Sequence, residues 1–408
     1  MIPVKEAIKI IDREIKALGG ETVRLDDAVG RVLAEDVVAD SDMPPFDRSQ
    51  MDGYAVRAED TENAPVMVRV VGESAAGRSW IGELLPGQAV RIMTGARLPN
   101  GADAVQKVEL TSQHDTGRWN EDLGGDITLL EPTKPGRFIV PRGSEVNAGE
   151  TVLKAGTRIN EGAVAPLAAF GYTEVKVVSR PRVAVMATGT EIVDASEQPG
   201  DDQIRNSNSP MLRAFAEKDG ADVTVLPISG DDLASLKAHL SVAIADNDFL
   251  VLTGGVSVGK YDLTKLALTE LGAELYFERV RLKPGKPTVF GRLGKCHVFG
   301  LPGNPVSSAV TYFLFVRRAL LAAQGATVTG LSAGSVVIDG DVKGTKERES
   351  YLPARLRTDS HGRLIAEPIR WHGSSDFISF AAAEALIRVP EGERFEKGDV
   401  AGIFFLPR

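Results

Sequence analysis

The sequence predicts a multidomain protein of the α/β and β classes, built around a doubly wound parallel sheet. Two observations carry this prediction. After residue 180, short apolar runs alternate with segments of helical periodicity, which is typical of parallel strands joined by crossover helices. In residues 55–140, and again beyond residue 325, short apolar runs are separated by turn residues, which indicates small β domains.

The N-terminal region predicts one helix and then a loop. Apolar residues from Val4 to Leu18 fall on one helical face, and Gly19-Gly20 ends the period. Residues 40–54 are polar and marked by prolines, as loops are.

A connector follows the first β domain. Residues 141–178 hold one short helix, expected over 161–170, and end in a β-like run. Because that run can return to the first region, the β domain between them is expected to be an insertion. The expected domains are 1–45 together with 141–178, then 46–140, 179–326 and 327–408.

The α/β region is expected to carry its chemistry at one edge of the sheet, because ligands bind at the carboxyl ends of parallel strands. The expected strands are 183–186, 223–227, 249–252 and 297–301, and the expected helices are 210–218, 233–245, 263–271 and 307–322.

Both β regions contain short strands. Those beyond residue 325 are expected to form a small barrel or sandwich. The expected strands are 66–71, 89–93 and 127–130 in the first region, and 336–338, 351–356, 364–368 and 385–389 in the second.

The bulk composition excludes several classes of protein. The chain has 408 residues, of which 43% are hydrophobic and 25% charged, which is ordinary for a soluble protein of about two to four domains. A net charge of −9 argues against nucleic-acid binding. The single cysteine, Cys296, excludes an intramolecular disulfide, fits a reducing cytoplasm and is expected in the core rather than as a nucleophile.

Neither a signal peptide nor a membrane span is expected. The N-terminus lacks an apolar signal core. The longest apolar run, 310–323, is interrupted by Arg317 and Arg318 and is too short to cross a bilayer. We therefore expect a soluble cytoplasmic protein.

A glycine-rich loop is the most informative segment of the chain. A short apolar run ends at Leu252, a loop with Gly254, Gly255 and Gly259 follows, and helical spacing begins at Leu263. Glycines let the backbone approach a phosphate closely, and a helix N-terminus offers unpaired N–H groups. For a single glycine, a tight βα turn is the favoured explanation. Three glycines favour ligand binding.

The same loop nearly matches a P-loop. Lys260 follows the last glycine, but Tyr261 stands where that motif needs a Ser or Thr hydroxyl for magnesium. The loop is therefore not expected to bind a nucleoside triphosphate. Ser257 and Asp262 supply the polar groups, and Asp262 suits a metal or a proton better than Tyr261 does.

Carboxylates follow three of the expected strands. They are Glu191 after the first strand, Asp231 and Asp232 after the second, and Asp262 after the glycine loop. Such a set beside a phosphate suits Mg²⁺, which takes hard oxygen ligands and keeps phosphate in its shell. One of the two adjacent aspartates is expected to cap the helix that follows, and Glu191 taken alone would be a solvated loop residue.

Basic residues are expected to serve the same edge. Arg279, Arg281 and Lys283 alternate, so they share one face of a strand. Lys283 and Lys286 lie in Lys-Pro-Gly-Lys-Pro (283–287), where prolines stiffen the backbone and a pair of ammonium groups suits an oxyanion. A solvated strand face is an equal alternative for the alternating charges.

Five motifs stand in order along the chain and at plausible spacing, starting near the N-terminus. They are Met-Pro-Pro-Phe-Asp-Arg-Ser-Gln-Met-Asp-Gly-Tyr-Ala-Val (43–56), Arg-Ile-Met-Thr-Gly-Ala (91–96), Thr-Gly-Gly-Val-Ser-Val-Gly (253–259), Lys-Pro-Gly-Lys-Pro (283–287) and Leu-Pro-Gly-Asn-Pro (301–305). Together they resemble one protein family, the molybdopterin molybdenumtransferases, or MoeA family, which includes the gephyrin E domain.

The resemblance implies an elongated four-domain homodimer whose α/β domain is of the molybdopterin-binding type, joined to an inserted β domain, a connector domain and a C-terminal β-barrel. It implies insertion of molybdate, as co-substrate, into adenylylated molybdopterin, with Mg²⁺-dependent cleavage of the adenylate and release of AMP. The molybdopterin adenylyltransferase and molybdoenzyme-maturation proteins are left open as further partners.

The resemblance also implies roles for particular residues. Asp52 and Thr94, from the inserted domain, would complete the site across the dimer. The substrate-binding residues would be Gly254, Gly255, Ser257, Gly259, Pro302 and Pro305; the molybdate-binding residues Lys283, Lys286, Arg348 and Ser375; the Mg²⁺ ligands Glu191 and Asp231; and the catalytic residues Asp262, Asp231, Asp52 and Thr94.

The chain departs from the family pattern in places. Thr190 stands where the family usually has Asp, beside the expected metal ligand Glu191. Asp376 and Glu384 replace the usual Arg and Asn near Ser375. Two alternatives stay open, a tungstate-inserting paralogue and a non-catalytic scaffold of the gephyrin E-domain type.

Overall fold

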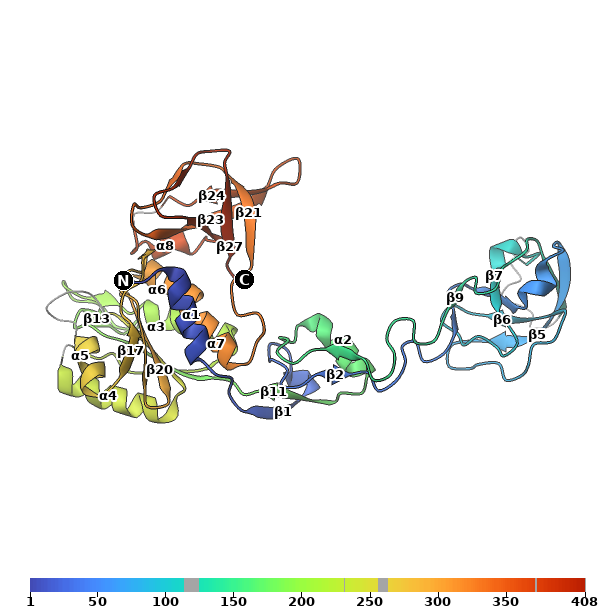
Figure 1. Cartoon of the computed structure of the whole chain (residues 1–408), viewed down its shortest axis with the longest axis horizontal. Coiled ribbons are helices and arrows are strands. Elements are labelled where there is room, and N and C mark those ends of the chain that lie inside the picture. Colours follow the sequence, from blue (N-terminus) through green and yellow to red (C-terminus); the bar gives the residue numbers. More distant parts are fainter. Residues whose placement is uncertain (114–124, 231, 256–262, 371–372, 408) are drawn as a thin grey trace. The chain divides into compact units, whose positions relative to one another are not determined.

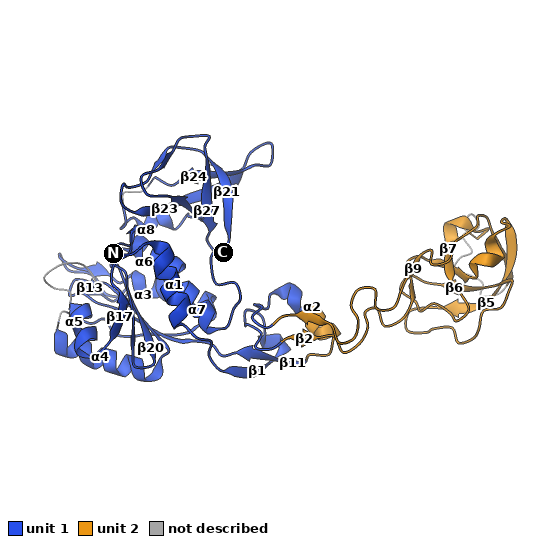
Figure 2. Cartoon of the chain, in the orientation of Figure 1, with its two compact units in different colours: residues 1–35, 155–164, 173–408 blue, residues 36–154, 165–172 orange. Residues whose placement is uncertain are grey.

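The structure is a computed structural model that describes residues 1–113, 125–230, 232–255, 263–370 and 373–407 (Figure 1). The chain divides into two compact units. One comprises residues 1–35, 155–164 and 173–408, and the other comprises residues 36–154 and 165–172 (Figure 2).

The first unit is built around a six-stranded sheet. Its strands, in spatial order, are β15 (Asp222–Val225), β12 (Arg182–Ala187), β16 (Phe249–Thr253), β20 (Cys296–Leu301), β19 (Val289–Leu293) and β17 (Glu274–Phe277). The first four are parallel, as predicted, whereas β19 and β17 pair antiparallel. The sequence analysis did not predict these two strands. They extend the sheet because Gly294, at a φ of 62°, allows a tight turn between β19 and β20.

Helices cover both faces of this sheet, which confirms the doubly wound prediction. Along β12 the buried side chains alternate. Val183 and Val185 pack against α1, α3, α6 and α7, and Ala184 and Met186 pack against α4 and α5. The helices are α1 (Val4–Glu14), α3 (Asn208–Lys218), α4 (Leu233–Asp246), α5 (Leu263–Glu270), α6 (Pro305–Thr311) and α7 (Arg317–Ala323). Cys296 is buried here, and burial raises the pKa of its thiol to about 12, in keeping with a core residue.

The N-terminal helix ends earlier than predicted. Ile15 is extended, and the N–H of Leu18 donates a hydrogen bond to the carbonyl of Ala323 at the end of α7. Ile15 and Leu18 nevertheless pack into the same core as α1. The last part of the predicted apolar spacing therefore belongs to an extended segment and not to a longer helix.

Farther along the chain, β1 (Gly20–Arg24) pairs antiparallel with β11 (Glu174–Val178). The fourfold domain division stays a prediction.

One continuous helical stretch, Pro305–Ala323, is long and apolar enough to cross a membrane, yet 83% of its most apolar window is buried inside the protein. It comprises α6, a π-helical turn (Tyr312–Val316) and α7. Most of its side chains belong to the core of the sheet, so it is accounted for as a core helix.

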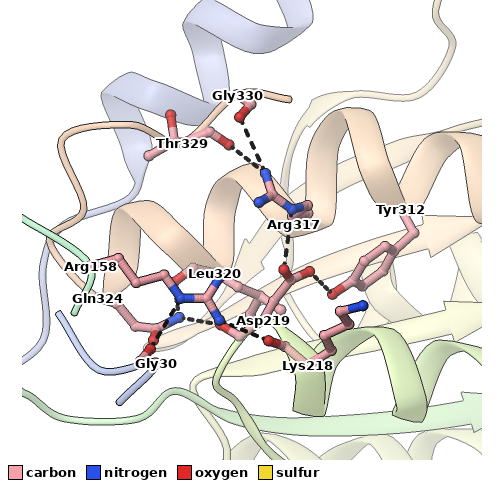
Figure 3. A network of polar contacts seen from close by, with 10 residues as sticks. All are labelled: Gly30, Arg158, Lys218, Asp219, Tyr312, Arg317, Leu320, Gln324, Thr329 and Gly330. Atoms are coloured by element: carbon pink, nitrogen blue, oxygen red, sulfur yellow. Dashed lines mark hydrogen bonds and ion pairs between the residues drawn. The ribbon is translucent and has the colours of Figure 1, made fainter. Parts of the chain in front are cut away.

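A buried carboxylate anchors this helix. Asp219, at the end of α3, accepts hydrogen bonds from the Tyr312 hydroxyl at 2.7 Å and from Nε of Arg317 at 3.1 Å (Figure 3). Burial raises the pKa of the Asp219 carboxyl, and the Arg317 charge opposes that rise. Nη1 of Arg317 also donates to the carbonyls of Thr329 and Gly330, which lead into the C-terminal region.

The C-terminal region of this unit is a closed five-stranded barrel, which is one of the two predicted forms, a barrel or a sandwich. The ring runs β23 (Glu349–Thr358), β24 (Leu364–Pro368), β21 (Ala333–Ile338), β27 (Val400–Phe405), β25 (Ala385–Val389) and back to β23. The short strand β18 (Leu282–Lys283) pairs with β23 and so attaches the Lys283 loop to the barrel. Helix α8 (Phe377–Phe380) follows β24.

The second unit contains a five-stranded sheet in the order β7 (Ala104–Lys107), β4 (Gly53–Val56), β6 (Gln88–Ile92), β5 (Val66–Ser74) and β8 (Gly125–Leu129). Its core is small and apolar, with Tyr54, Val56, Val68 and Ile127 among the buried side chains. Helix α2 (Glu161–Ala169) matches the predicted connector helix.

Candidate functional site

The carboxyl edge of the parallel sheet has a topological switch point. The chain runs from β12 through α3 to β15 on one side, and then through α4 to β16 on the other side of β12. The turns after β12 and β16 therefore diverge, which leaves a crevice where such sheets bind ligands.

A cavity of about 800 Å³ lies at this edge. Turns from three adjacent strands line it: Thr188 after β12, Gly254 and Gly255 after β16, and Pro302 to Pro305 after β20. Ser375 and Phe377, from the C-terminal region, line another part of the cavity. The predicted substrate-binding residues Gly254, Gly255, Pro302 and Pro305 thus share one cavity.

Both described glycines of the loop occupy positions that need glycine. Gly254 and Gly255 have φ angles of 90° and 61°, in the left-handed region. A Cβ on Gly254 would lie 2.4 Å from the carbonyl oxygen of Thr188. A Cβ on Gly255 would lie 2.8 Å from Oγ1 of Thr188 and 2.3 Å from Oγ1 of Thr264. Residues 256–262 lie outside the described residues, and with them Ser257, Gly259, Lys260, Tyr261 and Asp262.

Glu191 lines the same cavity. It follows Gly189, whose φ of 139° turns the chain, and a Cβ on Gly189 would lie 2.4 Å from a carboxylate oxygen of Glu191. The carboxylate therefore lies close against its own turn, beside the cavity. Asp231 lies outside the described residues. Asp232 caps α4 by accepting a hydrogen bond from the N–H of Ser235, which confirms the predicted cap.

Glu191 is the carboxylate among the described residues that line the first cavity, and it is the side chain to test as a magnesium ligand. Among the residues that the structure describes, no group of three His, Cys, Asp or Glu side chains could hold a metal ion. Mg²⁺ is commonly held by one or two carboxylates, with substrate phosphates and waters completing its shell. The single carboxylate of Glu191 beside the cavity fits that mode of binding.

Asn208 joins two of the turns that line the cavity. Its side-chain Nδ2 donates hydrogen bonds to Oγ1 of Thr253 at 2.8 Å and to the carbonyl oxygen of Gly303 at 2.7 Å. Asn208 is the first residue of α3 and is only 8% exposed. Sequence reasoning missed it, because an Asn before an apolar helical period predicts a helix cap. The actual signal was the run Asn206-Ser207-Asn208-Ser209, with more polar groups than one cap uses.

A second cavity, of about 560 Å³, adjoins the first and shares Pro287, Pro302 and Asn304 with it. Lys283, Lys286 and Arg348 all line this second cavity. None of these three side chains has an ion pair with another described residue. The structure thus brings together the three basic residues predicted to bind molybdate, from the loop after β17 and from the barrel.

The loop that carries the two lysines is held from both sides. The carbonyl of Lys286 accepts hydrogen bonds from the N–H groups of Val280 and Thr288, and the carbonyl of Gly285 accepts one from the Thr288 hydroxyl. A Cβ on Gly285 would lie 2.4 Å from the Thr311 side chain, so the loop packs tightly on α6. The predicted strand through the alternating charges is only two residues long, although Val280 and Leu282 face the core as that alternation predicts.

Ser375 is separated from the lysines. It lines the first cavity, whereas Ser374 lines the second and accepts a hydrogen bond from Nδ2 of Asn304 at 2.7 Å. Nearby, Asp376 caps α8 by accepting from the N–H of Ser379. Glu384 accepts from the N–H of Leu356 within the barrel. These two departures from the family pattern therefore have local structural roles.

Asp52 and Thr94 meet within the second unit. One carboxylate oxygen of Asp52 accepts hydrogen bonds from the N–H of Thr94 at 2.7 Å and from its hydroxyl at 2.9 Å. Both residues are exposed. The pair is preformed, and its catalytic role stays a prediction.

Three family models together match most of the chain. The MoeA N-terminal region (domain I and II) matches residues 2–171, a probable molybdopterin binding domain matches residues 184–322, and the MoeA C-terminal region (domain IV) matches residues 335–405. The second match covers the sheet whose edge forms the first cavity.

Curated relatives match over nearly all of their length. The chain is 36% identical to the molybdopterin molybdenumtransferase of Staphylococcus aureus (strain COL), over 98% of this chain and 95% of that protein. It is also 36% identical to the enzyme of that name from Bacillus subtilis (strain 168), over 99% of this chain and 94% of the relative. The crystal structure of the molybdopterin biosynthesis protein MoeA of Pyrococcus horikoshii OT3 aligns over 100% of both chains, with a TM-score of 0.84 and 32% identity. The chain therefore belongs to the molybdopterin molybdenumtransferase (MoeA) family, transferases of molybdenum cofactor biosynthesis.

Proposed function

We propose that this protein inserts molybdate into adenylylated molybdopterin and releases AMP. The observation that carries the proposal is the pair of adjoining cavities with a shared wall. One is lined by glycine turns at the switch point, and the other is lined by three cations. The first suits a phosphate-bearing substrate, and the second suits a small dianion.

The glycine turn and the cations divide the binding work in this proposal. Gly254 and Gly255 let the backbone approach the substrate's phosphate, with Ser257 and Gly259 continuing the same loop. Lys283, Lys286 and Arg348 hold molybdate by charge-assisted hydrogen bonds. Because the two cavities adjoin, an oxyanion held by the lysines is placed next to the bound pterin, and this proximity favours transfer. Ser375 is retained as a molybdate-binding candidate from the edge of the first cavity.

In this proposal, Glu191 and Asp231 would hold Mg²⁺ beside the phosphate. Bound there, the ion would stabilise the negative charge that develops on the departing AMP. Asp262 is the proposed catalytic carboxylate. The homodimer, the roles of Asp52 and Thr94 in it, the further protein partners and the cytoplasmic location rest on the family resemblance and on the composition.

The test is incubation of the purified protein with adenylylated molybdopterin, Mg²⁺ and either molybdate or tungstate, with AMP followed by chromatography. We expect AMP release that depends on the oxyanion and on Mg²⁺. Release with tungstate alone would favour the tungstate-inserting alternative. Absence of oxyanion-dependent AMP from a folded protein would overturn the proposal.

A further inference from the structure

Two buried hydroxyl groups flank the backbone of Gly255. They belong to Thr188, which follows β12, and to Thr264, in the first turn of α5. Thr188 is 6% exposed and Thr264 is 1% exposed. Within the described parts of the chain, neither Oγ1 atom has a hydrogen-bond partner.

An unpartnered buried hydroxyl destabilises a folded protein, because it has lost its hydrogen bonds to water without replacing them. Most buried polar groups are therefore paired, and an exception needs a reason. At Thr188 the backbone is already held in the sheet. Its N–H donates to the carbonyl of Thr253 at 3.0 Å, and the residue forms a parallel bridge with Ser229. The hydroxyl is not needed to hold the residue in place.

The two hydroxyls differ in one respect. Thr188 lines the first cavity, whereas Thr264 is not among the residues that line it. Thr188 is therefore a residue of the cavity wall whose unpartnered hydroxyl lies directly beside the glycine turn. A hydroxyl in such a position can donate to an anionic oxygen, which is the group that the turn is shaped to receive.

We propose that the Thr188 hydroxyl is a ligand of the substrate's phosphate. It donates a hydrogen bond to a phosphate oxygen that rests on the Gly254–Gly255 turn. The proposal deepens the proposed function and rests on it. It also explains the unpartnered state of the free protein, since the partner arrives with the substrate.

If Thr188 binds the phosphate, removing its hydroxyl should raise the stability of the free protein and weaken the binding of AMP. Thr188→Val keeps the branched shape and removes only the hydroxyl. In the free protein, this change removes an unpaired polar group, so we expect Tm to rise by about 2 °C or more. The same change removes one charge-assisted hydrogen bond to phosphate, so we expect AMP to bind roughly tenfold more weakly. Thr188→Ser keeps the hydroxyl and should bind AMP within about threefold of the unchanged protein.

Thr264→Val is the matched control. It also removes an unpartnered buried hydroxyl beside Gly255, but from a residue that does not line the cavity. We expect it to raise Tm in the same way and to leave the affinity for AMP unchanged.

The measurements are thermal unfolding without ligand, and calorimetric titration with AMP, in EDTA and again in Mg²⁺. Neither measurement needs turnover. If the protein releases no AMP, the proposed function fails, but these two measurements still test the role of Thr188. Four results would overturn the assignment: a lower Tm in Thr188→Val, an unchanged AMP affinity, an equal loss of affinity in Thr264→Val, or no AMP binding by the unchanged protein. A loss of affinity seen only in Mg²⁺ would assign the hydroxyl to the metal instead.

Discussion

The side-chain amide of Asn208 donates a hydrogen bond to the carbonyl oxygen of Gly303, 2.7 Å away, and so ties the start of α3 to the turn after β20. The orientation of this amide is fixed, because a carbonyl can only accept. Its second bond, to Oγ1 of Thr253, reaches the end of β16, where the glycine turn begins. A Cβ on Gly303 would lie only 3.6 Å from Cα of Gly254, so these two turns pack directly on each other.

Removing this tie should impair catalysis more than stability. In Asn208→Ala the two segments lose their common partner, and a displacement of about 1 Å in a binding site costs activity steeply. We expect kcat/KM for AMP release to fall by about tenfold or more, with a loss of about 1–2 kcal/mol in the free energy of unfolding. Steady-state kinetics and urea denaturation measure the two effects.

Asn247→Ala is the control for that variant. Asn247 is also a buried asparagine, and its Nδ2 donates to the carbonyl of Ala243 at the end of α4, among residues that do not line the cavity. We expect a similar loss of stability with unchanged kcat/KM. Equal kinetic losses in both variants would show that Asn208 acts only through general stability.

A change in the lysine loop should selectively raise the concentration of oxyanion that the reaction needs. Lys286→Gln keeps most of the side-chain length and removes the charge that lines the second cavity. We expect the molybdate concentration for half-maximal AMP release to rise by roughly tenfold, and the KM for the adenylylated pterin to stay within about twofold. Tungstate should show the same shift, because both oxyanions have the same charge.

Lys295→Gln provides the matched comparison, since Lys295 is exposed in the turn between β19 and β20 and does not line either cavity. Its molybdate dependence should match that of the unchanged protein. If Lys286→Gln also keeps the original molybdate dependence, the second cavity is not the oxyanion site.

The parallel strands and their helices could be predicted from the sequence, because each has its own apolar period and its own turn. β24 and β25 were predicted to the residue. β17 and β19 were missed, because Glu274, Tyr276 and Arg292 interrupt their apolar character at the edge of the sheet. Pairing with β20, rather than local sequence, makes them strands.

Which of the site residues lie together was harder to predict from the sequence. Lys283 and Lys286 are close in sequence, but Arg348 joins them only because β18 pairs with β23 beside it. Ser374 and Ser375 are adjacent, and a local turn decides which of them lines which cavity. Thr188 lies three residues before Glu191, but only the packing of Gly255 against its hydroxyl singles it out.

The buried ion pair between Asp219 and Arg317 should carry more stability than an exposed one. In Asp219→Ala the Arg317 side chain, 11% exposed, would lose its counter-charge, and the Tyr312 hydroxyl would lose its acceptor. We expect the free energy of unfolding to fall by about 3–5 kcal/mol, measured by urea denaturation at neutral pH. Asp12→Ala removes the half-exposed partner of Arg318 and should lower it by about 0–1 kcal/mol. Similar losses in the two variants would contradict this ranking.

His297 should make the stability of the first unit depend on pH. Its ring stacks on Phe290 and lies 5.6 Å from the ring of Phe249, between centroids. Burial is the main cause that lowers the pKa of His297, with a smaller effect of the Arg292 charge. The folded state therefore disfavours the protonated ring, whereas the unfolded chain protonates it near pH 6.5. The contribution of His297 to stability is fully present above about pH 6.5 and is lost as the pH falls through that value towards the lowered pKa.

The measurement is Tm between pH 7.5 and pH 5.5 for the unchanged protein and for His297→Leu, which cannot titrate. We expect the Tm of the variant to fall less over this range, so that the difference in Tm between the two proteins changes with pH. His361→Gln, at an exposed turn beside Ser360, is the control and should follow the curve of the unchanged protein. Parallel curves for His297→Leu and the unchanged protein would mean that His297 does not couple protonation to folding.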